Sequence, residues 1–402
     1  MDSRSGLPVV GMVGGGQLAR MTHQAAVSLG QSLRVLAGGP DEPAALVAAD
    51  VVVGRHDDLT VLRRLAVGCD AVTFDHEHVP TEHLRTLVAE GVAVYPGPDA
   101  LAHAQDKLLM RRTLAGLGVP VPPFREVTRP QDAVSFGAEY GWPCVLKAAR
   151  GGYDGRGLWM LTTPDDARRE VTRLLAAGTP LLVEQRVAMR RELAALVARS
   201  PFGQGAAWPV VQTVQRDGIC VEVLAPAPGL DTELAQAAQQ LALHVAATLD
   251  VVGVLAVELF EMATGQLLVN ELAMRPHNSG HWTIEGAATS QFEQHLRAVL
   301  DYPLGSTEPR APACVMANVL GAATSPMMGI DERVHHLMAR YPQAKVHLYA
   351  KHERPERKIG HVTVLGEALV PVREVAVAAA AFLATGSWPD GYPVHRPERE
   401  RA

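Results

Sequence analysis

The sequence contains little of what several classes of protein require. Its four cysteines, Cys69, Cys144, Cys220 and Cys314, are far apart, and none forms a CxxC pair. This pattern disfavours a disulfide framework and a zinc site, and it fits a reducing compartment. No apolar stretch approaches the roughly 20 residues of a membrane helix, and no signal-peptide pattern precedes the first glycine turn. We therefore expect a cytoplasmic protein without a membrane partner.

An excess of either charge is also missing. The 402 residues include 37 basic and 43 acidic side chains, for a net charge of −6, and only 5% are aromatic. This balance disfavours nucleic acid as a partner, so any anion must be bound by a local cluster of residues. The length and the 48% hydrophobic content indicate two or three ordinary globular domains.

The order of apolar segments predicts an α/β protein. Short apolar strands alternate with helical segments over the first hundred residues, which is typical of a parallel sheet. A helix is then expected over Leu101–Leu117, followed by the proline-rich stretch GVPVPPF. A smaller unit follows up to LLVEQRV (181–187), and a larger α/β unit continues to about residue 386.

A glycine turn lies near the start of the chain. GGGQLA (14–19) follows a strand and begins a helix, and Asp41 follows the next strand, as in the dinucleotide-binding pattern G-x-G-x-x-A. A tight strand-to-helix turn in any α/β domain gives the same pattern, and we favour that interpretation. A nicotinamide-dependent oxidoreductase is kept as an alternative of a different class.

A second glycine-rich stretch, RGGYDGRGLW (150–159), lies between two strand-like runs. It therefore differs from the P-loop and the Rossmann turn, which both begin a helix. Glycines expose backbone N–H groups to phosphates, and Lys147, Arg150 and Arg156 add positive charge. We predict a cover over nucleotide phosphates; the alternative is a solvated hairpin.

Two glutamates are predicted to face each other across a hairpin. The segments VELFEM, ATGQ and LLVNEL suggest a two-residue turn at Thr264-Gly265, which places Glu258 opposite Glu271. Facing carboxylates destabilise a sheet unless a proton or a cation lies between them. We predict Mg²⁺, since it accompanies phosphates. The alternatives are one protonated glutamate, or a bulge that shifts the register.

Two later segments are candidate anion sites. RPHNSGH (275–281) is a polar loop after a strand, suited to a small anion, or else an ordinary hydrogen-bonded turn. KHERPERKIGH (351–361) concentrates basic residues after VHLYA, and it makes either a phosphate pocket or a solvated face.

In this order the motifs resemble those of the ATP-grasp superfamily, and within it the bacterial 5-(carboxyamino)imidazole ribonucleotide synthases. The segments that carry the resemblance are GGGQLARM, VTFDHEHVP, AQDKLLMR, GGYDGRG, LLVEQRV, NELAMRPHNSGHWTIEGA and YAKHERPERKIGH. It covers nearly the whole chain, and GGYDGRG together with RPHNSGHWT is its most specific part. The implied architecture is a biotin-carboxylase-like parallel α/β domain (1–106), a linker helix with a small α+β lid (107–187), a C-terminal α+β ATP-grasp domain (188–386) and a polar tail (387–402).

The resemblance also implies an activity. Members of the family join 5-aminoimidazole ribonucleotide, bicarbonate and ATP into 5-(carboxyamino)imidazole ribonucleotide, ADP and phosphate through carboxyphosphate, in de novo purine biosynthesis. ATP and Mg²⁺, or Mn²⁺ in its place, are the implied cofactors, and a homodimer is the implied assembly. The nearest alternative is another ATP-grasp ligase, such as the formate-dependent glycinamide ribonucleotide formyltransferase. A non-catalytic nucleotide-binding protein is disfavoured by the glutamate pair.

Carried over position by position, the resemblance implies four sets of site residues. Those for ATP are Lys107, Lys147, Gly152, Tyr153, Asp154, Gly155, Arg156, Gly157, Leu158, Glu184, Gln185, Arg186, Val187, Glu192, Gln215, Asn270 and Glu271. Those for the ribonucleotide are Glu77, Tyr153, Asp154, Arg156, Lys351, Arg357 and Lys358. Arg275, His277 and Asn278 would hold bicarbonate and act in catalysis with Lys147 and Arg156, and Glu258 and Glu271 would bind the metal.

Four positions depart from the family pattern. Asp75 stands where glutamate is frequent, Lys107 replaces an arginine, Gln215 replaces a histidine, and Met274 replaces a proline. A lysine keeps the charge of arginine but loses its bidentate fork. None of the changes removes a predicted metal ligand.

Overall fold

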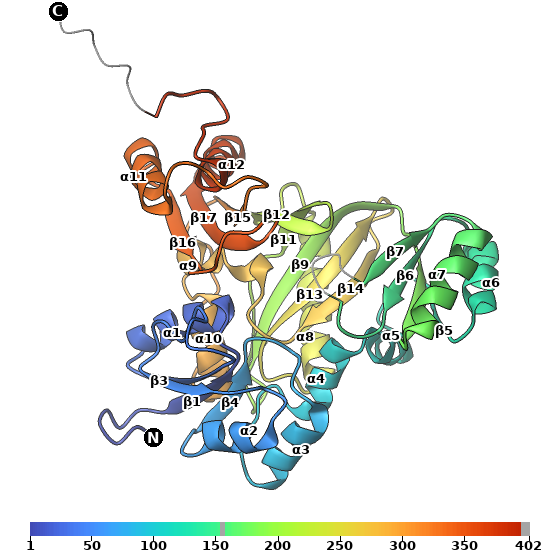
Figure 1. Ribbon diagram of the computed structural model, residues 1–402, viewed down its shortest axis with the longest axis horizontal. Helices are drawn as coiled ribbons and strands as arrows, with labels where there is room; N and C mark the ends of the chain where they lie inside the picture. The colour runs from blue at the N-terminus through green and yellow to red at the C-terminus, as the bar shows by residue number, and fades with distance from the viewer. Residues whose placement is uncertain (153–156, 395–402) are drawn as a thin grey trace, which may run out of the picture.

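A parallel sheet begins the computed structural model, which describes residues 1–152 and 157–394 (Figure 1). Its strands are β1 (Val9–Val13), β2 (Ser32–Ala37), β3 (Asp50–Val53) and β4 (Ala71–Phe74), in the order β3-β2-β1-β4. The helices beside it are α1 (Gln17–Ser28), α2 (Leu59–Ala66) and α3 (Thr81–Ala89). All of β1 is buried, as expected of a parallel strand covered on both faces.

The helix expected over Leu101–Leu117 is interrupted, and that prediction was wrong. The structure has α4 (Pro98–Gln105) and α5 (Lys107–Gly116), separated by Asp106 in an extended conformation. The Asp106 carboxylate accepts hydrogen bonds from the backbone N–H groups of Leu108 and Leu109, both at 3.0 Å, and so caps α5. This break makes Lys107 the first residue of a new helix, directed at the cavity described below.

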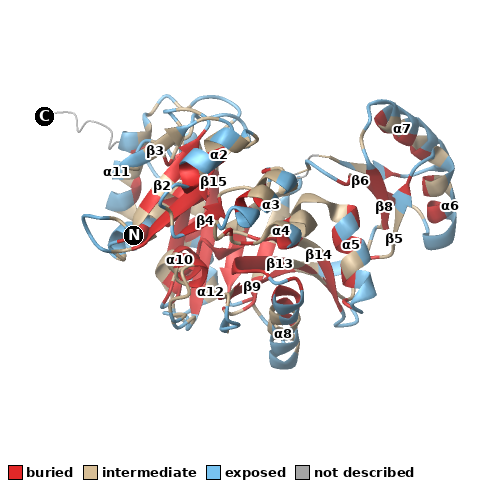
Figure 2. Cartoon of the chain, turned by 90° about the horizontal axis from the view of Figure 1, so that it is seen from below, coloured by how far each residue is buried: buried red, intermediate tan, exposed pale blue. Residues whose placement is uncertain are grey.

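A small antiparallel sheet forms a separate unit at one end of the molecule (Figures 1 and 2). Its strands are β5 (Phe124–Val127), β6 (Cys144–Ala148), β7 (Leu158–Leu161) and β8 (Leu181–Gln185), in the order β5-β8-β6-β7. Helices α6 (Pro130–Tyr140) and α7 (Pro164–Ala176) pack on it around the buried Phe136. The predicted glycine loop does connect strand to strand, from β6 to β7, but Tyr153, Asp154, Gly155 and Arg156 lie outside the described residues.

A long antiparallel sheet forms the centre of the molecule. Its strands are β9 (Met189–Arg199), β10 (Gly205–Ala207), β11 (Val211–Arg216), β12 (Ile219–Ala225), β13 (Gly253–Met262), β14 (Leu267–Ala273), β15 (Ala313–Leu320), β16 (Lys345–Leu348) and β17 (Lys358–Gly366). They follow the order β14-β13-β9-β11-β12-β15-β17-β16, with β10 paired to β9. The remaining elements are α8 (Thr232–Thr248), the 3₁₀ turn η1 (Asn278–Gly280), α9 (Thr283–Gly286), α10 (Gln291–Val299), α11 (Ile330–Arg340) and α12 (Leu369–Thr385).

Helices cover the long sheet and join it to the N-terminal domain. α8 packs on β9 and β13, and α12 packs on β15 and β17. On α10, Leu296 and Val299 pack into the same core as Val10 and Met12 of β1. The fold class expected from the sequence is confirmed. In the described part of the chain, none of the helices has the length and apolar character needed to span a bilayer.

Candidate active site

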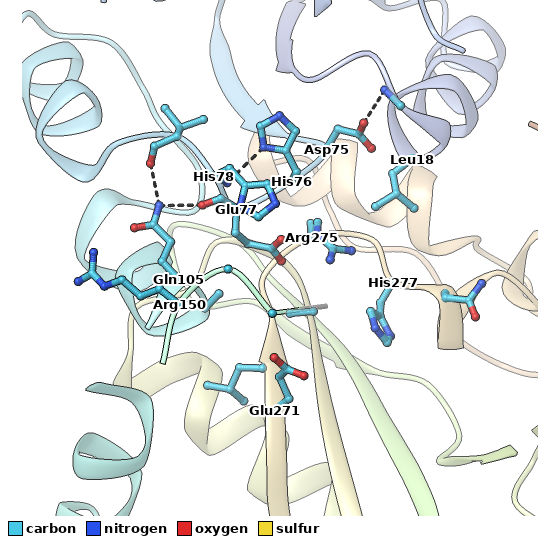
Figure 3. A pocket seen from close by; sticks show the side chains of 18 of the residues that line it. Leu18, Asp75, His76, Glu77, His78, Gln105, Arg150, Glu271, Arg275 and His277 are labelled. Atoms are coloured by element: carbon cyan, nitrogen blue, oxygen red, sulfur yellow. Dashed lines mark hydrogen bonds and ion pairs between the residues drawn. The ribbon is translucent and has the colours of Figure 1, made fainter. Parts of the chain in front are cut away.

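A cavity of about 1440 Å³ opens between the N-terminal domain and the ends of the central strands (Figure 3). The predicted site residues in its wall are Glu77, Lys107, Gly152, Glu258, Glu271, Arg275, His277, Asn278, Lys351, Arg357 and Lys358. They come from distant parts of the sequence, and charged side chains of both signs face the same space. The structure thus brings together the predicted metal, bicarbonate and ribonucleotide positions.

The two glutamates of the hairpin are paired as predicted, although the predicted turn was wrong. The loop has three residues, Ala263–Gly265, since Met262 N–H donates to the carbonyl of Gln266 at 2.9 Å. A bulge then compensates, because β13 pairs Leu259 with Val269 but Glu258 with Glu271. The extra residue is Asn270. Two opposite shifts of one residue therefore leave the carboxylates facing each other.

Each of these carboxylates contacts a cationic or ionisable side chain. The Lys107 ammonium contacts Oε1 of Glu271, and Nε2 of His277 lies 3.2 Å from Oε1 of Glu258. Burial raises the pKa of Glu258, but the hydrogen bond and charge of His277 outweigh that effect and leave it below its usual value. Glu258 is thus held ionised, as a ligand of a cation must be.

Arg275 connects the central sheet to the N-terminal domain. Its Nε donates to Oε2 of Glu77 at 2.8 Å, and the two side chains are adjacent in Figure 3. Burial lowers the pKa of Arg275, but the charge and hydrogen bond of Glu77 and the charge of Asp75 more than reverse this and raise it. A guanidinium fixed in this way can hold a small anion in the cavity.

The loop after Arg275 is held by side-chain hydrogen bonds. Nδ1 of His277 lies 2.8 Å from Oγ of Ser279. Asn278 and Asn318 exchange two amide hydrogen bonds, of 3.0 and 2.8 Å. His277 therefore projects from a fixed backbone into the cavity, which suits a residue that must orient a substrate.

Part of the basic segment KHERPERKIGH lines the cavity, while residues 352–356 are exposed. Lys351, Arg354, Arg357 and Lys358 are all part of the cavity wall. Lys351 also donates to Oε1 of Gln17, the first residue of α1, at 2.5 Å. Positive charge therefore gathers where the N-terminal domain meets the end of the central sheet.

Other predicted ATP residues form a second cluster, between the lid sheet and the central sheet. Glu184 accepts from Nε of Arg111 at 2.7 Å and pairs with Nζ of Lys147 at 2.6 Å. Nζ of Lys147 also donates to Oδ1 of Asn270 at 3.3 Å. Burial raises the pKa of Glu184, but the charges of Lys147 and Arg111 lower it to about 2. Its carboxylate is therefore engaged within the protein, by Arg111 and Lys147.

Glu192 and Gln215 lie next to this cluster on the central sheet. Glu192 on β9 is paired with Phe260 and Thr213, on the face that carries Glu258. Burial, followed by the charge of Glu258, raises the pKa of Glu192 despite a hydrogen bond with Gln215. A hydroxyl group, such as that of a ribose, would offer this carboxyl group a neutral partner.

The last predicted ATP residues lie at the ends of lid strands. Gln185 ends β8 and donates to the carbonyl of Tyr140 at 3.3 Å, while Arg186 and Leu158 are exposed and Val187 is half-buried. Gly157 adopts φ = +76° just before β7. None of these residues is part of the wall of the large cavity, among the residues that the structure describes.

The turn GGGQLA holds one of the protein's own carboxylates. Oδ2 of Asp75 accepts from the N–H of Gly16 at 2.5 Å, and Oδ1 accepts from the N–H of Ala19 at 3.2 Å. A Cβ atom on Gly16 would lie 2.2 Å from Oδ2 of Asp75. In a dinucleotide-binding turn a phosphate occupies this position at the helix N-terminus. Asp75 therefore argues against a nicotinamide site.

Sequence reasoning missed Arg111, which supports two predicted residues at once. It is buried; its Nη2 donates to the carbonyl of Asn270 at 2.7 Å, and its Nε donates to Glu184. Its position four residues after Lys107 was an available signal, because i and i+4 side chains share one face of a helix.

A metal site made of protein ligands alone is not visible. Within 1–152 and 157–394, there is no group of three or more His, Cys, Asp or Glu side chains that could hold a metal ion. Mg²⁺ is commonly held by one or two carboxylates together with substrate phosphates and water. A facing pair of ionisable carboxylates beside an amide oxygen is compatible with that kind of site.

Family models match three consecutive parts of the chain. The "Ribonucleotide synthetase preATP-grasp domain" matches residues 7–105, and the "ATP-grasp domain" matches residues 112–292. The "Phosphoribosylaminoimidazole carboxylase C-terminal domain" matches residues 314–374. The first match contains the parallel sheet, the second contains the lid sheet and β9–β14 of the long sheet, and the third contains most of β15 and all of β16 and β17.

Individual relatives agree over almost the full length. The N5-carboxyaminoimidazole ribonucleotide synthase of Mycobacterium tuberculosis (strain H37Rv) is 63% identical over 389 residues, covering 97% of this chain and 91% of the relative. The Aspergillus clavatus enzyme complexed with ATP is 34% identical, with a TM-score of 0.86 and coverage of 94% and 98%. Its complex with ADP and 5-aminoimidazole ribonucleotide is 33% identical, with a TM-score of 0.84 and the same coverage. This chain belongs to the N5-carboxyaminoimidazole ribonucleotide synthases, a family of ATP-dependent ligases.

Proposed function

We propose that this enzyme uses ATP to carboxylate 5-aminoimidazole ribonucleotide with bicarbonate, giving N5-carboxyaminoimidazole ribonucleotide, ADP and phosphate. The observation that supports the proposal is one cavity that both sets of proposed anion-binding residues line. Arg275 and His277 lie on one part of its wall, and Lys351, Arg357 and Lys358 lie on another. Two anionic substrates could thus meet in one cavity beside the Glu258/Glu271 pair.

Bicarbonate needs activation before an amine can attack it. Transfer of the γ-phosphoryl group of ATP to a bicarbonate oxygen makes carboxyphosphate, and the negative charge then increases on oxygens that need nearby cations. Lys107 is placed for this role in the cavity, and Lys147 lies beside Asn270 at the second cluster. Arg275 and His277 would orient the bicarbonate.

The ribonucleotide supplies the acceptor amine. Its phosphate suits the basic wall of Lys351, Arg357 and Lys358, while Glu77 could accept a hydrogen bond from the aminoimidazole. The exocyclic amine then attacks carboxyphosphate, or CO₂ released from it, and phosphate leaves. Because carboxyphosphate hydrolyses in water, the lid loop after β6 has to exclude solvent while the intermediate exists.

Glu258 and Glu271, with the oxygen of Asn270 nearby, would hold Mg²⁺ or Mn²⁺. When bound, the ion would supply charge neutralisation for the phosphates of ATP. In the structure, Lys107 contacts the Glu271 carboxylate, and His277 contacts the Glu258 carboxylate. We also infer a homodimer, which the family resemblance implies, and a cytoplasmic location, because the separated cysteines fit a reducing compartment.

The decisive experiment is Mg²⁺-dependent ADP formation with bicarbonate, measured with and without 5-aminoimidazole ribonucleotide. Glycinamide ribonucleotide with formate serves as the control for the related formyltransferase reaction. We expect ADP to form only with the aminoimidazole acceptor. ADP formation with glycinamide ribonucleotide and formate instead would refute the proposed substrates, and binding of a nicotinamide cofactor in place of ATP would refute the ligase chemistry.

A further inference from the structure

Three side chains connect the basic wall of the cavity to the loop that carries His277. Gln17 accepts from Nζ of Lys351 through Oε1, and its Nε2 lies 3.4 Å from Nε2 of His281. On the other side of the His281 ring, Nδ1 lies 2.9 Å from Nε2 of Gln291. The line Gln17–His281–Gln291 thus runs between the proposed ribonucleotide and bicarbonate positions.

The backbone of His277 determines how the Gln291 carboxamide is oriented. Oε1 of Gln291 accepts from the N–H of His277, and Nε2 donates to the carbonyl of His277, both at 2.8 Å. In the reverse orientation, the Gln291 NH₂ group would face the N–H of His277, and the Gln291 oxygen would face the carbonyl of His277, so neither pair could form a hydrogen bond. The second hydrogen of Nε2 is therefore directed at Nδ1 of His281. Gly280 permits this approach, because a Cβ atom there would lie 2.3 Å from Oε1 of Gln291.

His281 is fully buried and uncharged. Burial, followed by the charge of His277 and other nearby cations, lowers its pKa well below the usual value. A neutral imidazole has one N–H donor and one acceptor nitrogen. Because Nδ1 accepts from Gln291, the ring proton is on Nε2, which faces Gln17.

Gln17 cannot satisfy both of its neighbours while Lys351 contacts it. An ammonium group only donates, so the amide oxygen of Gln17 has to face Lys351. The NH₂ group of Gln17 then faces the N–H of His281, which opposes two donors across 3.4 Å. If the orientation of the Gln17 amide is reversed, its oxygen faces His281, but its NH₂ group then faces the Lys351 ammonium, and two donors oppose each other there. If Lys351 contacts another acceptor, Oε1 of Gln17 can accept from His281 and the conflict disappears.

We propose that Gln17 is a positioning residue that couples the ribonucleotide site to the bicarbonate site, an inference that rests on the function proposed above. The phosphate of the ribonucleotide draws Lys351 from Gln17, and the carboxamide turns its oxygen to His281. The His281–Gln291 pair then holds the backbone of His277 more firmly. Binding of the ribonucleotide thereby favours binding of bicarbonate, and the reverse holds by linkage.

Two substitutions at this position should separate the steps. The KM for bicarbonate is measured by ADP formation at low and at saturating 5-aminoimidazole ribonucleotide. In the unmodified enzyme we expect it to fall about tenfold with the ribonucleotide, the value of one hydrogen bond. Gln17→Leu cannot accept from His281, so its KM for bicarbonate should stay high at both concentrations.

Gln17→Glu should have the opposite effect. A carboxylate can accept from Lys351 and His281 at once, so the KM for bicarbonate should be low at both ribonucleotide concentrations. The same carboxylate forms an ion pair with Lys351, which should raise the KM for the ribonucleotide severalfold. A purely structural role of Gln17 would not shift these constants in opposite directions.

The matched control is Gln24→Leu, on the exposed part of α1, which should keep the coupling of the unmodified enzyme. The proposal is overturned if the KM for bicarbonate never depends on the ribonucleotide, or if both Gln17 variants shift it in the same direction. An enzyme that forms no ADP from these substrates would overturn the proposed function itself, and this inference with it.

Discussion

The turn at Gly14–Gly16 and the loop at 150–158 are both rich in glycine, yet the described glycines of the two segments differ in their surroundings. In the turn, Cβ atoms on Gly14, Gly15 and Gly16 would each lie within 3 Å of another side chain, including those of Asp75 and Glu42. In the loop, a Cβ atom on Gly151 would meet nothing within 4 Å. Gly151 has φ = +78°, a conformation that favours glycine; in the turn, Gly14 has a positive φ of +105° as well as the close contacts.

The difference teaches that glycine in a sequence indicates close approach or unusual backbone, but does not say which. The turn brings its backbone against the protein's own carboxylates, so its glycines are needed for close packing, although Gly16 also lines the cavity. The loop edges the cavity through Gly151 and Gly152, so it serves the site. Removing one of the facing carboxylates should act on turnover, while adding a side chain inside the tightly packed turn should act on the free energy of unfolding.

The largest effect is expected on the cavity side, from Glu271→Gln. This change removes one of the two facing carboxylates and the partner of Lys107. We expect turnover to fall at least about a thousandfold, or roughly 4 kcal/mol in the barrier, while the unfolding midpoint changes little. ADP formation and chemical denaturation measure the two quantities. Glu374→Gln, at an exposed position on α12, is the control that should remain active, and an active Glu271→Gln enzyme would contradict the metal assignment.

On the stability side, the strand that leads to Asp75 is joined to the central sheet by His295. Its Nδ1 accepts from the N–H of Val254 at 3.0 Å, and its Nε2 lies 2.7 Å from Oγ1 of Thr73. Burial lowers the pKa of His295 to about 4. The unfolded state binds this proton first, so the stabilisation is complete above pH 6.5 and is lost as the pH falls to about 4.

That pKa difference corresponds to roughly 3 kcal/mol in the free energy of unfolding. Urea denaturation between pH 7 and pH 4 measures the loss, and His295→Gln removes this titration. The variant should therefore show a shallower dependence on pH than the unmodified protein. Parallel curves for the two proteins would show that His295 does not contribute.

The next effect is expected at the turn itself, from Gly16→Ala. The added Cβ atom would lie 2.2 Å from Oδ2 of Asp75 and displace that carboxylate. We expect a loss of roughly 2 kcal/mol, the cost of overpacking. In the double variant with Asp75→Ala, the clash is absent and only the helix cap is lost, so much of the stability should return. Strictly additive losses would contradict this account.

The smallest effect is expected from Gly151→Ala in the loop. Nothing obstructs the methyl group, and the cost is only that of a positive φ, about 1 kcal/mol. Gly151→Asn should recover part of it, since asparagine tolerates this conformation, whereas Gly16→Asn should be as damaging as Gly16→Ala. Denaturation midpoints of the four variants test the comparison directly, and a rescue by asparagine at both positions would break it.

Much of the fold could be predicted from the sequence because its signals are local. The alternation of strands and helices predicted the parallel sheet, and the glycine loop was expected between strands. The pairing of Glu258 with Glu271 was also predicted, yet two errors cancelled: the turn is one residue longer, and the bulge at Asn270 restores the register. Nothing in the residue types of LLVNEL indicated that bulge.

The helix expected over Leu101–Leu117 failed for a related reason. Apolar periodicity continues through AQDKLLMR, but the Asp106 side chain caps a new helix and interrupts the old one. From the sequence alone, an aspartate inside a helical pattern can either face solvent or cap a new helix. The partner that also holds Asp106 here is Arg150, which donates to Oδ2 at 2.9 Å and is 44 residues away in the sequence, so no local pattern indicates it.

By itself, the sequence determined most of the elements and the family to which the chain belongs, because these depend on short-range patterns and motifs. The tertiary structure decided which side chains contact the backbone of the glycine turn and which side chains hydrogen-bond to one another in the site. Asp75 reaches Gly16 from 59 residues away, and His281 reaches Gln17 from 264 residues away. Contacts over such separations depend on how the sheets pack against one another, and no local periodicity specifies that packing.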